Sequence, residues 1–85
     1  MTTSLHNAEL LRNAFAQALV IDPSQVTDQL TYNSIAAWDS TAHMLLIAEL
    51  ENCFNVMLDT DDIIDMSSVA KAKQILQKYQ IEFSE

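Results

Sequence analysis

The chain has 85 residues, of which 49% are hydrophobic, and it contains one proline and no glycine. Its size predicts one small domain, too small for an enzyme with its own deep active site, and its composition favours an all-α fold over disorder. The formal net charge is −8, which excludes nucleic-acid binding because phosphate contacts need Lys and Arg. We therefore expect partners that carry basic surfaces.

The sequence also predicts the compartment and the oligomeric state. Its single cysteine, Cys53, cannot form an intramolecular disulfide, and no charged segment followed by an apolar one opens the chain. The longest apolar run, Met44 to Ala48, is much too short to cross a bilayer. These features predict a cytoplasmic monomer without a membrane span.

A first helix is expected from Asn7 or Ala8 to Leu19 or Val20, after a loose lead-in at residues 1–7. Its apolar residues recur at helical spacing and comprise Leu11, Ala14, Phe15, Ala18 and Leu19. Asn7 is the expected N-cap, because its short side chain can accept hydrogen bonds from the free amides of the first turn.

A long connection is predicted to follow, because the residue before Pro23 avoids helical geometry. The apolar residues between Ser24 and Ala37 are spaced too irregularly for one amphipathic helix. A loop of this length needs apolar side chains that attach it to the core, and the candidates are Val26, Leu30 and Ile35. Trp38 is expected to be a packing anchor at the end of the loop.

The segment from Ser40 to Phe54 predicts the central helix of the chain. Helical spacing places its inward residues on one face, namely His43, Leu46, Ile47, Leu50 and Phe54. Asp39 is the expected N-cap, and Asn55 suits the end of the helix because it tolerates left-handed geometry. Ser40 then lies in the first turn with its hydroxyl toward solvent.

A short third helix is expected to begin with Asp59 or Thr60 as its cap and to end at Asp65 or Met66.

A fourth helix, capped by Ser67 or Ser68, is expected to reach Lys78 or Tyr79. Its inward residues are predicted to be Val69, Ala72, Ile75, Leu76 and Tyr79. Residues 81–85 are predicted to form a frayed tail.

The Asp39-Ser40 pair, the apolar helix after it and the segment from Glu51 to Ile64 together resemble the acyl carrier protein family. The likeness covers roughly Ala8 to Tyr79, and the spacing agrees without a gap through Val69. The resemblance implies a four-helix bundle of the acyl-carrier type, with three longer helices, one short helix and a long first loop, in a single domain spanning residues 1–85.

The same resemblance implies that a phosphopantetheinyl transferase attaches 4′-phosphopantetheine from coenzyme A to Ser40, with Asp39 near the Mg²⁺ used in the transfer. The protein would then carry acyl or related intermediates as thioesters, without being an enzyme. Trp38 before the motif, and Thr41 where many carriers have leucine or methionine, favour a specialised lipid, polyketide or aminoacyl pathway over routine fatty-acid synthesis. Its further partners would be acyl-loading and acyl-processing enzymes.

Charge distribution predicts where such partners bind. No Lys or Arg occurs between Arg12 and Lys71, whereas nine acidic residues lie in that interval. Met44 and Leu45 flank Ser40 outside the inward stripe, which is typical of a contact surface. We therefore predict a docking face for basic partner surfaces that consists of Thr41, Met44, Leu45, Ala48, Glu51, Asp61 and Asp62.

Other chemistries fit the sequence less well. Ser40 and His43 are three residues apart, but no orienting carboxylate or oxyanion donor accompanies them, so no catalytic residue is assigned. His43 is expected to be a packed histidine, and the resemblance places it near the cargo. The acidic residues from Asp59 to Asp65 lack the glycine and the terminal glutamate of a calcium loop, so no metal is expected. The alternative function is an unmodified acidic interaction module in which Asp39-Ser40 is only a helix cap.

Overall fold

The computed structural model describes the backbone of residues 2–83, with side chains from residue 6 onward. The described residues form four α-helices and one short 3₁₀ helix, with no strand among them. The elements are α1 (Thr2–Leu19), η1 (Pro23–Gln25), α2 (Ser40–Phe54), α3 (Thr60–Asp65) and α4 (Val69–Lys78). This confirms the all-α prediction, with three longer helices and one short helix.

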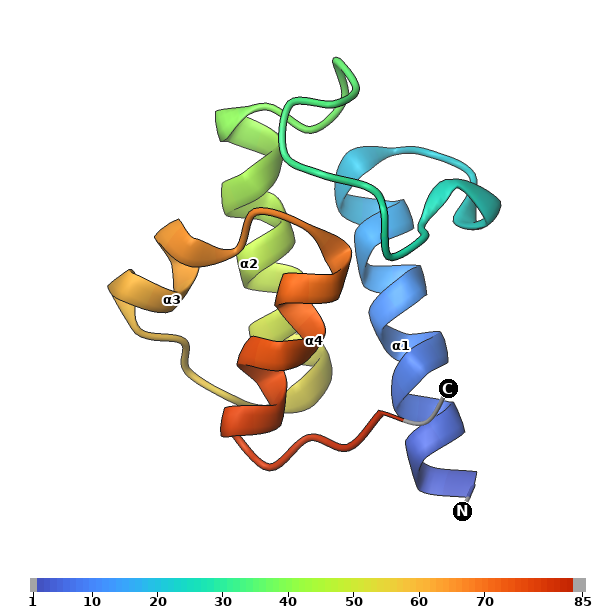
Figure 1. The fold of residues 1–85 in the computed structure, drawn as a ribbon, viewed down its shortest axis with the longest axis vertical. Helices are drawn as coiled ribbons and strands as arrows, with labels where there is room; N and C mark the ends of the chain where they lie inside the picture. Colours follow the sequence, from blue (N-terminus) through green and yellow to red (C-terminus); the bar gives the residue numbers. More distant parts are fainter. Residues whose placement is uncertain (1, 84–85) are drawn as a thin grey trace.

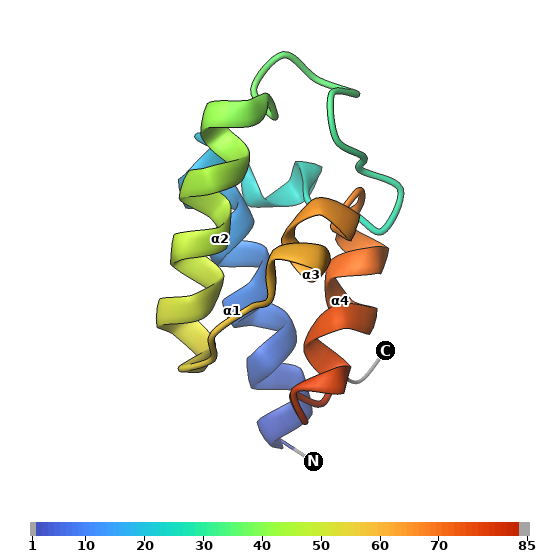
Figure 2. The same cartoon turned by 90° about the vertical axis from the view of Figure 1, so that its left-hand side faces the viewer.

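The three longer helices pack side by side (Figure 1). Their directions place the long loop and the starts of α2 and α4 at the same end of the molecule. Helix α1 runs antiparallel to α2, whereas α4 runs in the same direction as α2 (Figures 1 and 2). The long loop after η1 crosses the end at which α2 and α4 begin. The short helix α3 lies on the side of α2 and α4 that is away from α1 (Figures 1 and 2). Ser40 therefore lies where the loop, α2 and the approach to α4 meet.

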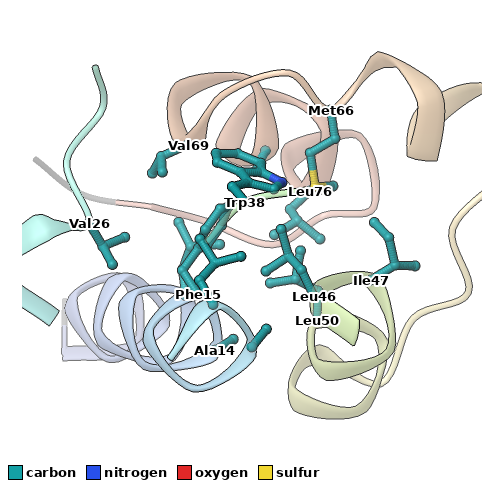
Figure 3. Close-up of a cluster of buried hydrophobic side chains, with 14 of the residues drawn as sticks. Ala14, Phe15, Val26, Trp38, Leu46, Ile47, Leu50, Met66, Val69 and Leu76 are labelled. Carbon is teal, nitrogen blue, oxygen red and sulfur yellow. The ribbon is translucent and has the colours of Figure 1, made fainter. Parts of the chain in front are cut away.

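The core fills the space between α1, α2 and α4 (Figure 3). Phe15, Leu46, Leu50 and Leu76 are fully buried there, and so is Trp38, which comes from the loop. The rings of Phe15 and Trp38 meet edge to face with centroids 5.3 Å apart, a favoured geometry for an aromatic pair. The prediction that Trp38 is a packing anchor is confirmed.

The long loop is attached both by side chains and by backbone hydrogen bonds. Val26 and Leu30 are buried and Ile35 is half-buried, as predicted. The Val69 amide donates to the Leu30 carbonyl oxygen at 3.0 Å, and the Tyr32 amide donates to the Ser67 carbonyl oxygen at 2.9 Å. These bonds hold the loop against the start of α4, so its position is determined by the bundle.

Local capping sets the ends of α2 and α4, as the sequence predicts. Asp39 Oδ1 accepts from the Ala42 amide at 2.9 Å, and Ser68 Oγ accepts from the Lys71 amide at 2.9 Å. Asn55 ends α2 in the left-handed region with φ of 54°. The start of α3 differs, because Asp59 occupies the cap position without a side-chain hydrogen bond to the helix.

Two of the helices end through left-handed residues that are unusual for this role. Val20 follows α1 with φ of 55°, and Gln80 follows α4 with φ of 70°. The Ile21 amide donates to the Ala16 carbonyl oxygen at 3.0 Å, which closes α1 in the way that glycine usually permits. Val20 is β-branched, so this backbone conformation is strained. Its side chain is 86% exposed, so its packing does little to offset the strain.

Helix α1 begins earlier than predicted. It starts at Thr2, so the expected loose lead-in at residues 1–7 is wrong for residues 2–7, and residue 1 lies outside the described residues. Asn7 is not an N-cap, because it lies inside the helix, and its Nδ2 donates to the Glu82 carbonyl oxygen at 3.0 Å. The sequence pattern missed this extension because the contact comes from a segment 75 residues away.

The C-terminal segment is correspondingly more ordered than predicted. Phe83 packs edge to face on Phe54 with ring centroids 6.0 Å apart, and Ile81 is half-buried against the core. The Ile81 amide donates to the Leu76 carbonyl oxygen at 3.2 Å. The frayed-tail prediction is therefore wrong for residues 81–83, and residues 84–85 lie outside the described part. In the described part of the chain, no helix is long and apolar enough to cross a membrane.

Candidate functional site

Ser40 opens α2 and is exposed. The preceding Asp39 provides the cap, since its Oδ1 accepts from the Ala42 amide and its carbonyl oxygen accepts from the His43 amide at 2.8 Å. The Ser40 hydroxyl is therefore not used for capping, and among the described residues it bonds only to the Tyr32 hydroxyl, at 2.9 Å. It lies at the positive end of the helix, where a negatively charged group is favoured.

A pocket of about 370 Å³ opens beside this hydroxyl. The long loop, α2, α3 and the connection to α4 each contribute to its walls, through Tyr32, Ser40, His43, Met44, Ile63, Ile64, Met66 and Ser67. Most of this surface is apolar, and Tyr32, Ser40 and Ser67 contribute hydroxyl groups. Pockets of about 300–1,000 Å³ with such walls are typical of small-molecule sites.

Three aromatic rings pack together next to the pocket, and two of them, Tyr32 and His43, line it. Tyr32 meets Trp38 and His43 edge to face, with centroids 6.1 and 5.5 Å away, while Trp38 and His43 stack with an angle of 20° between their planes. Trp38 is fully buried, so the group is attached to the core. Tyr32 is absent from the residues that sequence reasoning selected for the site, because nothing in its local pattern indicates that the loop returns to Ser40.

His43 is half-buried, and both of its ring nitrogens are engaged. Nδ1 accepts from Trp38 Nε1 at 3.0 Å, which leaves Nε2 as the donor to the Ile63 carbonyl oxygen at 2.9 Å. This pairing assigns the neutral tautomer with its proton on Nε2. His43 therefore has no ring nitrogen left to accept a proton from Ser40, and its bonds instead connect the buried Trp38 to α3.

Comparison with known proteins gives no relative: no family model matches the chain, and no match was found among curated proteins or solved structures. The function is therefore argued from the site itself.

Most of the predicted docking residues lie on the surface, and Met44 lines the same pocket as Ser40. Thr41, Ala48 and Asp61 are exposed, and Met44 and Leu45 are 59% and 56% exposed. Sequence reasoning missed Ile64, which borders the pocket and is 76% exposed. The sequence around Ile64 does not indicate which side of α3 is exposed, because a helix of six residues is too short to establish an apolar face.

Two predicted docking carboxylates have structural partners instead. Glu51 is half-buried, and its Oε2 accepts from the Leu58 amide at 3.0 Å, which holds the segment between α2 and α3. Asp62 is only 6% exposed, so the prediction that it lies on the docking surface is wrong.

The partners of Asp62 come from the end of α4. Lys78 Nζ donates to its Oδ1 at 2.6 Å, and the Tyr79 hydroxyl donates to its Oδ2 at 2.7 Å. The hydrogen bond from Lys78, reinforced by that from Tyr79, holds the pKa of Asp62 below its usual value. In turn, the bond to Asp62 raises the pKa of both Lys78 and Tyr79. These contacts attach α3 to α4, and they were missed because the partners lie 16 and 17 residues away.

The single cysteine of the chain, Cys53, lies half-buried on α2. Burial raises the pKa of its thiol, and the nearby Glu49 carboxylate raises it further. The thiol is thus protonated at neutral pH and is a weak nucleophile. Among the described residues, no group of three or more His, Cys, Asp and Glu side chains is placed to hold a metal ion.

Proposed function

We propose that the protein is a carrier domain that holds acyl or related intermediates as thioesters on a 4′-phosphopantetheine arm attached to Ser40. The observation that carries this proposal is the position of the Ser40 hydroxyl. It is exposed, released from capping by Asp39, and next to a largely apolar pocket. The all-α architecture, with three longer helices, one short helix and a long first loop, supports the same proposal.

The residues around Ser40 fit the attachment of a phosphodiester. The N-terminus of α2 favours the negative charge that the group would add next to Oγ. In the part of the chain that the structure describes, Asp39 uses Oδ1 for the cap, and Oδ2 has no partner, so a carboxylate oxygen is available to a cation brought by the transferase. The arm would supply a thiol that carries the cargo as a thioester.

In the transfer reaction, Ser40 Oγ acts as the nucleophile. It forms a bond to the phosphorus that carries the pantetheine group of coenzyme A, and the bond from that phosphorus to the adenosine bisphosphate breaks. The serine proton passes to a base of the transferase, because both His43 nitrogens are already engaged. Asp39 keeps Ser40 in the first turn of α2, so the chain contributes an exposed hydroxyl in a fixed position.

The pocket beside Ser40 supports a largely apolar cargo. Met44, Ile63, Ile64 and Met66 line it, so an aliphatic chain would replace water against them at about 25 cal/mol per Å² of apolar surface buried. At about 370 Å³ the space is at the small end for ligand sites, which favours short cargo or partial shelter of longer cargo. The proposed setting remains a specialised lipid, polyketide or aminoacyl pathway.

Partner enzymes are proposed to dock on the exposed residues beside Ser40. This docking surface consists of Thr41, Met44, Leu45, Ala48, Asp61 and Ile64. Its apolar side chains supply contact area, and Asp61 attracts basic residues of the transferase and the processing enzymes. Because Asp61 acts mainly on the encounter with the partner, its effect should be screened within about 10 Å at 0.1 M salt.

The docking surface can be tested with matched charge reversals. Asp61→Lys should slow transfer to Ser40 at low ionic strength and reduce its salt dependence, whereas Glu9→Lys, an exposed site on α1, makes the same change in net charge and should have a smaller effect. Equal effects of the two variants would show that only net charge matters.

Attachment itself is tested with a fluorescent coenzyme A analogue, Mg²⁺ and a transferase of broad specificity. The wild-type protein should become labelled, and Ser40→Ala should fold but remain unlabelled. Equal labelling of Ser40→Ala would contradict the proposal.

A further inference from the structure

The hydroxyl of Tyr32 lies 2.9 Å from Ser40 Oγ, although the two residues belong to different elements. Either oxygen can donate while both carry a proton. Tyr32 and Ser40 also line the same pocket, so their hydrogen bond lies at its edge. A phenol placed this close to the attachment oxygen is in contact with whatever replaces the serine proton.

Tyr32 is held in place by several independent contacts. Its backbone amide donates to the Ser67 carbonyl oxygen at 2.9 Å, which attaches this part of the loop to the approach of α4. Its ring packs edge to face on Trp38 and on His43. Because Trp38 is fully buried and donates to His43, the position of the phenol is determined by the core and not by the loop alone. The hydroxyl is thus presented to Ser40 by a rigid support.

We propose that Tyr32 is a positioning residue for the phosphopantetheine arm. It holds the Ser40 hydroxyl in the unmodified protein and donates a hydrogen bond to the phosphodiester after modification. This inference rests on the proposed function, and it assigns a role to a side chain that is not required for attachment itself.

The donor role follows from the change in chemistry at Oγ. Once Oγ is esterified it has no proton, so the Tyr32 hydroxyl can only donate there. The non-bridging phosphate oxygens share a negative charge and are stronger acceptors than the ester oxygen, and charge-assisted hydrogen bonds are shorter and stronger than neutral ones. Tyr32 therefore holds the first group of the arm on the side of Ser40 where the pocket opens.

Phosphorus NMR of the modified protein tests the contact directly. In the wild type, the phosphodiester signal of the folded protein should be displaced from that of the urea-unfolded protein, because folding brings the phosphate to Tyr32. Tyr32→Phe keeps the ring packing but removes the donor, and it should lose most of this displacement. The matched control is Tyr79→Phe, which removes the other phenol of the chain from its contact with Asp62 and should keep the displacement.

A second measurement needs no substitution. The carbon NMR signal of Tyr32 Cζ should change when the wild-type protein is modified, and that of Tyr79 Cζ should not. The inference is overturned if the Tyr32 signal is unchanged, or if a folded Tyr32→Phe keeps the full phosphorus displacement. In either case a modified Ser40 leaves the proposed function intact. Failure of the wild type to accept the group at all would overturn the proposed function and this inference together.

Discussion

Leu50→Ala should remove a large fraction of the stability of the protein. Leu50 is fully buried between α2 and its neighbours (Figure 3), so the substitution deletes three buried carbons. At about 0.8 kcal/mol per carbon the transfer term is about 2.4 kcal/mol, and incomplete collapse of the cavity raises the expected loss to about 3–4 kcal/mol. A chain of 85 residues has a total stability of only about 4–13 kcal/mol.

The matched control is Leu45→Ala, which makes the same substitution on the same helix at a residue that is 56% exposed. Its free energy of unfolding should change by less than about 1 kcal/mol. Both values come from urea unfolding followed by circular dichroism and by the fluorescence of Trp38, the one tryptophan of the chain. A loss below about 1 kcal/mol for Leu50→Ala, or equal losses for both variants, would refute the orientation of α2.

Three further predictions follow from individual contacts. Val20→Gly should raise the free energy of unfolding by about 0.5–1 kcal/mol, since relief of the left-handed strain exceeds the entropic cost of glycine; a loss of stability would contradict this. Asp62→Asn should destabilise the protein at neutral pH. Because the folded pKa of Asp62 is lowered, its contribution to the free energy of unfolding is present above the usual pKa of 3.8 and is lost as the pH falls through the folded pKa. The urea unfolding curve of the variant should therefore approach that of the wild type in acid. An equal gap in acid and at neutral pH would exclude this linkage. Cys53 should react with maleimide more slowly in the folded protein than in urea, because burial raises the pKa of its thiol, and equal rates would show that the thiol is not shielded.

The parts of the fold that sequence predicted are those with local signals. Asp39, Asn55 and Ser68 act through atoms within a few residues of themselves, so their capping roles are visible in the sequence. The inward face of α2 was likewise predicted from helical spacing: four of its five residues are buried and His43 is half-buried. The exposed position of Ser40 in the first turn of α2 was predicted for the same reason, because the cap and the helix start are adjacent in the chain, whereas its role as an attachment site was inferred from the family resemblance.

The missed features depend on contacts between distant segments. Asp62 resembles its exposed neighbour Asp61 in sequence, and only the approach of Lys78 and Tyr79 makes its burial favourable. The early start of α1 accompanies a hydrogen bond from Asn7 to the C-terminal segment. Tyr32 reaches Ser40 because backbone bonds attach the loop to the start of α4. Apolar periodicity contains no information about such pairings.

The central claim is that Ser40 is the attachment site, and the most direct test is intact mass spectrometry with peptide mapping. After incubation with coenzyme A, Mg²⁺ and a transferase of broad specificity, the wild type should gain the mass of one phosphopantetheine group, located on the peptide that contains Ser40.

Ser40→Ala should gain nothing, whereas Ser67→Ala, at the same pocket, should be modified like the wild type. Circular dichroism establishes that both variants are folded. If the wild type is unmodified while a known carrier is modified in the same reaction, or if the group lies on Ser34 or Ser67, the account is contradicted, and Asp39-Ser40 is a helix cap in an acidic interaction module.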